Sequence, residues 1–118
     1  MENASFITNQ EGDDLVVSFA IPRGVYGEVH SLTLLRTPKY EHVLDESERG
    51  VKVSFEDFSD DRTQFLKKVT ITDDVVTMTT DHGIHMVNIK DVDQTEIQKS
   101  KQILKKMNFD NRFELQVV

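Results

Sequence analysis

Apolar side chains alternate with polar ones along several short stretches of the chain. The sharpest alternation covers residues 51–56, where Val51, Val53 and Phe55 are separated by Lys52, Ser54 and Glu56. A period of two predicts a strand, because successive side chains of a strand point to opposite faces of the sheet. By this pattern and by their β-rich composition, strands are predicted at residues 15–21, 30–37, 51–55, 64–72, 75–80, 83–90 and 112–118.

Turn-forming residues separate these stretches. Pro22, Gly24 and Gly27 predict a turn after the first strand, and the second strand stops at Pro38, because proline has no backbone N–H to donate. The polar residues 39–49 are predicted to form a loop. The pair Asp73 and Asp74 predicts a short hairpin connection between two strands.

The period changes near Thr95 and becomes helical. At 100° per residue, one stripe is apolar and the opposite side carries the lysines. The stripe consists of Ile97, Ile103, Leu104 and Met107, with Ser100 inside it. The lysines are Lys99, Lys101, Lys105 and Lys106. Either Thr95 or Asp93 is predicted to cap the helix N-terminus, and Asn108 is predicted as a left-handed residue at its C-terminus.

Together these elements predict an α+β fold. The sheet is expected to be mainly antiparallel and meander-like, with about six to eight strands, and the late amphipathic helix is expected to cover one face. The 118 residues have the length of one domain, residues 1–118, and 37% of them are hydrophobic. No apolar run approaches the length of a membrane span, and the N-terminus lacks the features of a signal peptide. We therefore expect a soluble, cytoplasmic protein that makes no contact with membranes.

The residue counts exclude several kinds of chemistry. The absence of cysteine rules out disulfides, thiolate metal sites and a cysteine nucleophile. The net charge of −7 argues against general affinity for nucleic acid, since phosphate binding requires lysine and arginine. Residues 41–61 contain eight acidic and two basic residues, so nearly all of the net charge lies in one fifth of the chain.

The stretch "TDHGIHM" at residues 80–86 contains the densest set of possible metal ligands. Asp81, His82 and His85 lie close in sequence, but residues three apart on a strand point to opposite faces. A zinc site would also need His30 and His42 to approach. We therefore predict a polar turn here rather than a metal site.

Other candidate motifs are incomplete. The glycines of "RGVYGE" do not lead into a helix as those of a phosphate-binding loop do, so this stretch is predicted as a turn. The stretch "EDFSDD" contains several carboxylates, but it lacks the central glycine and the terminal glutamate of a calcium loop. We find no catalytic motif and expect no catalytic residues, no metal and no cofactor.

The acidic stretch 41–61 is the strongest candidate for binding another protein. Its carboxylates are interspersed with apolar side chains, a combination that suits docking on a basic surface. The predicted contact residues are Glu41, Asp45, Glu46, Glu48, Phe55, Glu56, Asp57, Phe58, Asp60 and Asp61.

The order of segments resembles a family of bacterial polymorphic-toxin immunity proteins, immunity protein family 10. The stretch "SLTLLRT" is similar to that family's hydrophobic strand ending in an arginine, here Arg36. The other similar stretches are "DDLVVSFA", "RGVKVSFEDFSDD", "FLKKVTITDDVVTMTT" and "MVNIKDVDQTEIQKSKQILKKM". The resemblance covers roughly residues 14–107. It implies a small cytoplasmic protein that binds a cognate toxin domain and blocks it without catalysis of its own.

Two alternatives to an immunity protein remain open from the sequence. One is a small β-rich enzyme or ligand-binding domain with an internal pocket. The other is an interaction module with a different partner.

Overall fold

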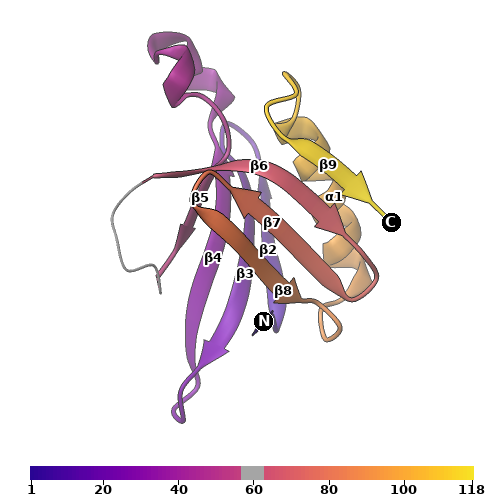
Figure 1. Ribbon diagram of the computed structural model, residues 1–118. Coiled ribbons are helices and arrows are strands. Elements are labelled where there is room, and N and C mark those ends of the chain that lie inside the picture. The colour runs from indigo at the N-terminus through magenta and orange to yellow at the C-terminus, as the bar shows by residue number, and fades with distance from the viewer. Residues whose placement is uncertain (57–62) are drawn as a thin grey trace.

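The computed structural model describes residues 1–56 and 63–118, and within them it contains nine strands and one α-helix (Figure 1). The strands are β1 (Glu2–Asn3), β2 (Phe6–Glu11), β3 (Leu15–Arg23), β4 (Glu28–Arg36), β5 (Lys52–Phe55), β6 (Gln64–Ile71), β7 (Val75–Thr80), β8 (Gly83–Asn88) and β9 (Glu114–Val117). The helix α1 spans Gln94–Met107, and two short 3₁₀ helices span Pro38–Val43 and Glu46–Glu48.

The strands form one mostly antiparallel sheet in the order β1-β8-β7-β6-β5-β4-β3-β2. Neighbours from β2 to β8 pair antiparallel, while β1 pairs parallel with β8 and β9 pairs parallel with β6. This arrangement confirms the predicted α+β class, the meander and the single late helix. The described sheet has one strand more than the upper end of the predicted range.

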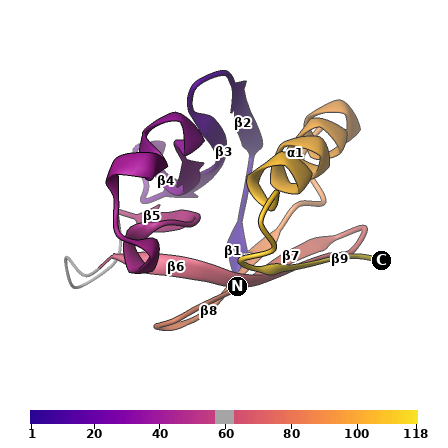
Figure 2. The same ribbon diagram turned by 90° about the horizontal axis from the view of Figure 1, so that it is seen from above.

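The sheet bends into two layers at β6. One edge of β6 pairs with β5 at Gln64 and Phe65, and then with β9 through Lys68–Ile71. Strands β2–β5 can therefore turn away from β6–β9. They form a second layer, with α1 beside them and above the first layer (Figure 2).

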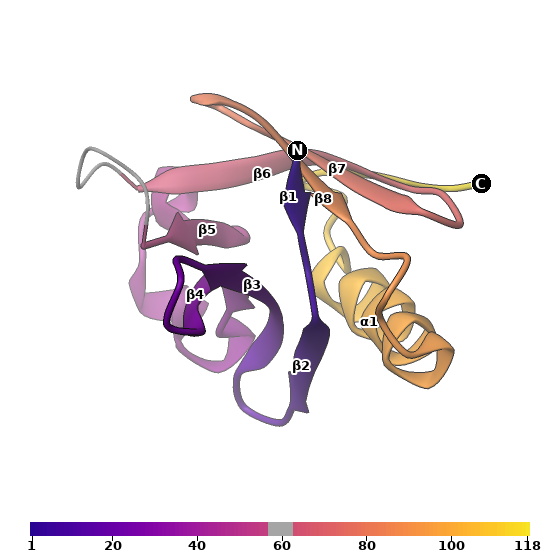
Figure 3. The same cartoon turned by 90° about the horizontal axis from the view of Figure 1, so that it is seen from below.

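The N-terminal segment joins the two layers, as Figure 3 shows from below. The backbone N–H of Ala4 donates to the carbonyl of Asn88 in β8, and the next N–H, of Ser5, donates to the carbonyl of Ala20 in β3. The crossing point is buried, because Ala4 belongs to the core.

A single core fills the space between the layers. The sheet layer with β2–β5 contributes Val17, Phe19, Leu32 and Leu34, the other layer contributes Val69, Met78 and Val87, and α1 contributes Ile103, Leu104 and Met107. All of these side chains are at most 1% exposed, so the helix docks through the stripe that its period predicts.

The predicted helix is confirmed, with one correction at its end. Asp93 is the N-cap, and its carboxylate accepts a hydrogen bond from the N–H of Thr95 at 2.7 Å. Asn108 follows the helix, but its φ of −97° is not left-handed; the residue with positive φ is Asn111. Asn108 instead keeps helical hydrogen bonds from its N–H to the carbonyls of Leu104 and Lys105. Within the described part of the chain, no helix is long and apolar enough to cross a membrane.

Three further features differ from the prediction. Residues 39–49 were predicted as a loop, but most of them lie in the two 3₁₀ helices. Strands β1 and β2 were not predicted, because their residues are mostly polar and only Ile7 of β2 is buried. Strand β3 continues through Pro22 to Arg23, so the turn contains only Gly24–Gly27.

Candidate protein-binding surface

The two 3₁₀ helices form a compact segment between β4 and β5, which we call the 3₁₀ segment (residues 38–48). Pro38 occupies the first turn, where the missing N–H costs no hydrogen bond. Side chains three residues apart share a face of a 3₁₀ helix. Tyr40 and Val43 therefore lie together, and both are exposed, whereas Glu41 turns into the protein and is only 8% exposed.

A buried arginine holds the 3₁₀ segment in place. Arg36, the last residue of β4, is 1% exposed, and all five of its N–H groups donate hydrogen bonds. Nε and Nη2 donate to the two carboxylate oxygens of Glu41 at 2.9 and 2.8 Å. Nη1 and Nη2 donate to the two oxygens of Asp110, each at 2.8 Å. The remaining N–H donates to the carbonyl of Met107 at 2.7 Å.

This network joins three distant parts of the chain. The Met107 carbonyl lies at the C-terminus of α1, where a cation is favourable because of the helix dipole. The ring of Phe109 stacks on Arg36, with the guanidinium carbon 4.2 Å from the ring centroid. Arg112 extends the network, since it binds Asp110 at 2.6 Å and the carbonyl of Glu46 at 3.1 Å. The 3₁₀ segment is thus fixed to the end of the helix.

The ion pairs keep these groups charged. Hydrogen bonds from Arg36 lower the pKa of Glu41, and the burial that opposes this shift is the weaker effect. The same donor, with Arg112, holds the pKa of Asp110 well below its ordinary value. Burial alone would lower the pKa of Arg36, but the hydrogen bonds to Asp110 and Glu41 together outweigh burial and raise it. The network therefore stays ionised throughout the neutral range.

The outer side of the 3₁₀ segment is acidic. Asp45, Glu46 and Glu48 are all exposed, and the side chain of Glu46 is 86% exposed even though it contacts Arg112. Together with the exposed Tyr40 and Val43, they form what we call the acidic surface. It combines three carboxylates with two apolar side chains on a short, braced element.

Two shallow hollows adjoin the acidic surface. They have volumes of about 210 and 370 Å³ and share three lining residues, Leu44, Glu48 and Lys52. Tyr40 lines the first hollow and Phe65 lines the second. A partner side chain could enter either hollow beside the carboxylate of Glu48.

The structure distributes the predicted contact residues over several places. Asp45, Glu46 and Glu48 lie together on the acidic surface, whereas Glu41 lies inside the fold and is bound to Arg36. Phe55 and Glu56 lie at the opposite end of β5 from Lys52. The remaining predicted contacts, Asp57, Phe58, Asp60 and Asp61, lie outside the described residues.

Sequence reasoning missed Tyr40 and Val43 as members of this surface. Tyr40 and Val43 are three residues apart after Pro38, and this spacing places two side chains on one face of a 3₁₀ helix. In a segment predicted as an irregular loop, the same spacing predicts no shared face.

The residues near position 80 form a turn that Asp81 links to β6. Asp81 Oδ1 accepts a hydrogen bond from the N–H of Phe65 at 2.9 Å and lies 3.7 Å from His82 Nε2. His85 Nε2 lies 3.1 Å from Gln64 Oε1, and burial lowers the pKa of this imidazole. The predicted turn at Asp81 and His82 is confirmed. Across residues 1–56 and 63–118, no three histidine or acidic side chains gather as they would around a metal ion.

Comparison of the chain with protein-family models, with curated proteins and with solved structures found no match.

Proposed function

We propose that this protein is a small acidic binding protein that docks on a basic surface of another protein through the acidic surface. The observation that carries the proposal is the position of Asp45, Glu46 and Glu48 on an element braced by the buried Arg36. A braced element loses little conformational entropy on binding, and carboxylates beside apolar side chains favour both fast association and slow release.

The partner we propose is a cognate toxin domain, as the resemblance to immunity proteins implies. Occlusion of a toxin requires no catalytic group, only a surface whose shape and charge complement the toxin. A toxin that acts on nucleic acid has a cationic active site, and carboxylates can occupy such a site in place of phosphates. The protein would then protect the cell that makes it.

The test is protection of cells that express a candidate toxin domain encoded by a neighbouring gene. We expect wild-type protein to restore growth and to co-purify with the toxin domain. The double variant Glu46→Lys/Glu48→Lys should lose protection, because two attractive charges become repulsive. The matched control is Asp91→Lys/Glu114→Lys, two exposed charge reversals away from the 3₁₀ segment that change the net charge equally.

Protection by the double variant that equals protection by wild type would contradict the proposed contact surface. Absence of protection by wild-type protein, with no complex formed, would contradict the proposed function itself.

A further inference from the structure

One edge of β8 is only partly paired. Along its other edge β8 pairs with β7 over its whole length, from Gly83 to Asn88. On the partly paired edge, β8 pairs with β1 only through Val87 and Asn88. No strand among the described residues pairs with this edge ahead of Val87. We call the edge along Gly83–Met86 the β8 free edge, where the name refers only to the outward backbone groups of Ile84 and Met86.

The direction of the backbone groups follows from two hydrogen bonds. The carbonyl of Asn88 accepts from the N–H of Ala4 in the N-terminal segment at 3.0 Å. The N–H of Ile89 donates to the backbone carbonyl of Asp74, on the side of β7, at 2.7 Å. Residues two apart in a strand direct their backbone groups to the same edge. The N–H and the carbonyl of one strand residue face the same edge, so the N–H of Asn88 faces β1 as its carbonyl does. The N–H groups of Ile84 and Met86 face the same edge and therefore point out of the sheet.

The side chains beside this edge are unusually apolar for an exposed strand. Ile84 is 65% exposed, and Met86 and Met1 are also exposed. Natural sheets usually protect such edges with lysine, proline or a bulge. The sequence Gly-Ile-His-Met of the β8 free edge has none of these.

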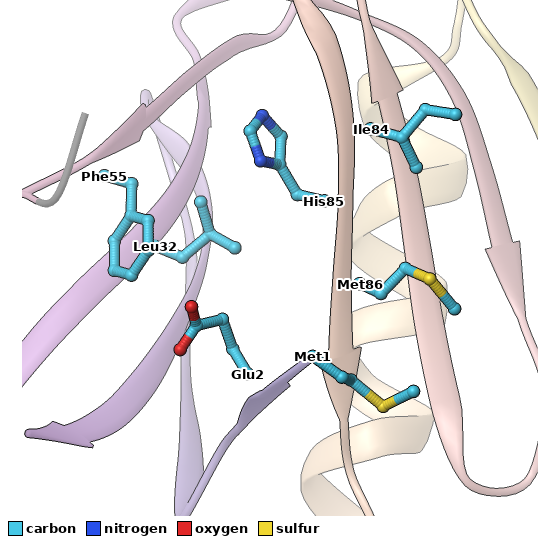
Figure 4. A pocket seen from close by; sticks show the side chains of 7 residues that line it. All are labelled: Met1, Glu2, Leu32, Phe55, Ile84, His85 and Met86. Carbon is cyan, nitrogen blue, oxygen red and sulfur yellow. The ribbon is translucent and has the colours of Figure 1, made fainter. Parts of the chain in front are cut away.

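A pocket lies on the inner side of the β8 free edge. Its volume is about 290 Å³, and it is lined by Met1, Glu2, Leu32, Phe55, Ile84, His85 and Met86. Figure 4 shows His85 pointing toward Leu32 and Phe55 across the pocket, while Ile84 and Met86 point away from it. The pocket is therefore bounded by β8 on one side and by β4 and β5 on the other.

The geometry favours a single extended segment as the occupant. Such a segment would pair with Ile84 and Met86 and place every second side chain over the pocket, where the partly buried ring of Phe55 is available.

The charge near the pocket indicates which protein supplies the segment. Phe55 lines the pocket, and the next residue, Glu56, has a side chain that is more than half exposed, beside His30 at 3.9 Å. Both residues belong to the acidic stretch 41–61 and are among the partner contacts predicted from the sequence, at the end of β5 opposite the acidic surface. A lysine or arginine flanking the apolar residue of the segment would face Glu56.

We propose that the partner protein inserts an extended segment beside β8, pairing with Ile84 and Met86, and places one apolar side chain in the pocket. This inference rests on the proposed function, because the segment belongs to the partner that the acidic surface recognises.

Amide hydrogen exchange in the complex with the toxin domain tests the pairing directly. We expect the amides of Ile84 and Met86 to exchange quickly in the free protein and at least about tenfold more slowly in the complex. The matched control is Val87, whose N–H faces β7 and should exchange slowly in both states. A complex in which Ile84 and Met86 exchange as in the free protein would overturn the inference and leave the proposed function intact.

Two substitutions at Ile84 distinguish the contribution of its backbone N–H to binding from that of its side chain. Ile84→Pro removes an N–H that points outward and spares the hydrogen bonds to β7, so it should weaken the complex about tenfold or more. Ile84→Thr keeps the N–H and should have a smaller effect. A folded Ile84→Pro protein that binds like wild type would contradict the inference, and if this variant does not fold, the exchange rates in wild-type protein decide.

The other occupants give different results. Dimers in sedimentation, with concentration-dependent protection of Ile84 in the absence of the toxin domain, would assign the edge to a second copy and overturn the inference. Failure of wild-type protein to form any complex with the toxin domain would contradict both proposals.

Discussion

At the scale of single residues, Arg36 decides whether the 3₁₀ segment has a fixed position. Its guanidinium is buried, yet each N–H group has an acceptor, and two carboxylates balance its charge. A buried charge is tolerated only when it is paired and hydrogen-bonded. Removal of Arg36 would leave the like charges of Glu41 and Asp110 close together, with only Arg112 still paired to Asp110.

We predict that Arg36→Met lowers the free energy of unfolding by about 3 kcal/mol, because breaking a buried pair leaves uncompensated charge. Urea unfolding measures this change. The matched control is Lys68→Met, which removes an exposed pair with Glu114 and should cost less than about 1 kcal/mol. Equal losses in the two variants would show that the Arg36 network contributes no more than a surface pair.

The sequence indicates Arg36 only in part. The resemblance to immunity proteins draws attention to an arginine at the end of a hydrophobic strand, but arginine is usually exposed, so its burial is not expected. Its acceptors lie 5, 71 and 74 positions away in sequence. Neither spacing nor periodicity connects residues so distant. For the same reason Glu41 was grouped with the exposed carboxylates around it.

At the scale of elements, the strands with clear alternation and the helix were predictable, and the N-terminal strands were not. Strands β3, β4, β6 and β7 lie between other strands, so their buried faces leave a clear pattern. Strand β1 has two residues and β2 lies at an edge, where one face is largely solvated. Their place in the sheet depends on backbone pairing with β8 and β3, which leaves little trace in composition.

The joint between the 3₁₀ segment and α1 should loosen in acid. The folded protein lowers the pKa of Glu41 and of Asp110 from ordinary values of 4.5 and 3.8. A group whose pKa is lowered by folding stabilises the protein at pH values above its ordinary pKa. This stability is lost as the pH falls through the folded-state pKa. We therefore expect the free energy of unfolding to fall as the pH drops from about 5 toward 2.

Urea unfolding across this pH range provides the measurement, with Asp110→Asn as the comparison. This variant should be less stable than wild type at neutral pH and should lose less stability on acidification, because one of the two titrating groups is absent. Parallel pH profiles for the two proteins would show that Asp110 does not contribute to the acid sensitivity.

At the scale of the whole molecule, the bent sheet separates two features suited to binding. The acidic surface lies on the 3₁₀ segment between β4 and β5, and the β8 free edge lies in the other layer. The concentration of charge in residues 41–61 was evident from the sequence, and Asp45, Glu46 and Glu48 do lie together. The β8 free edge could not be predicted, because it results from β1 pairing with only two residues of β8.

The central claim is that the acidic surface attracts a basic partner. The most direct measurement is the association rate with the proposed toxin partner as a function of salt, for wild-type protein and for Glu46→Lys/Glu48→Lys. We predict that the wild-type rate is high at low salt and falls steeply as salt increases, and that the variant associates about tenfold or more slowly with a flatter dependence. Equal rates with the same salt dependence in both proteins would contradict the claim.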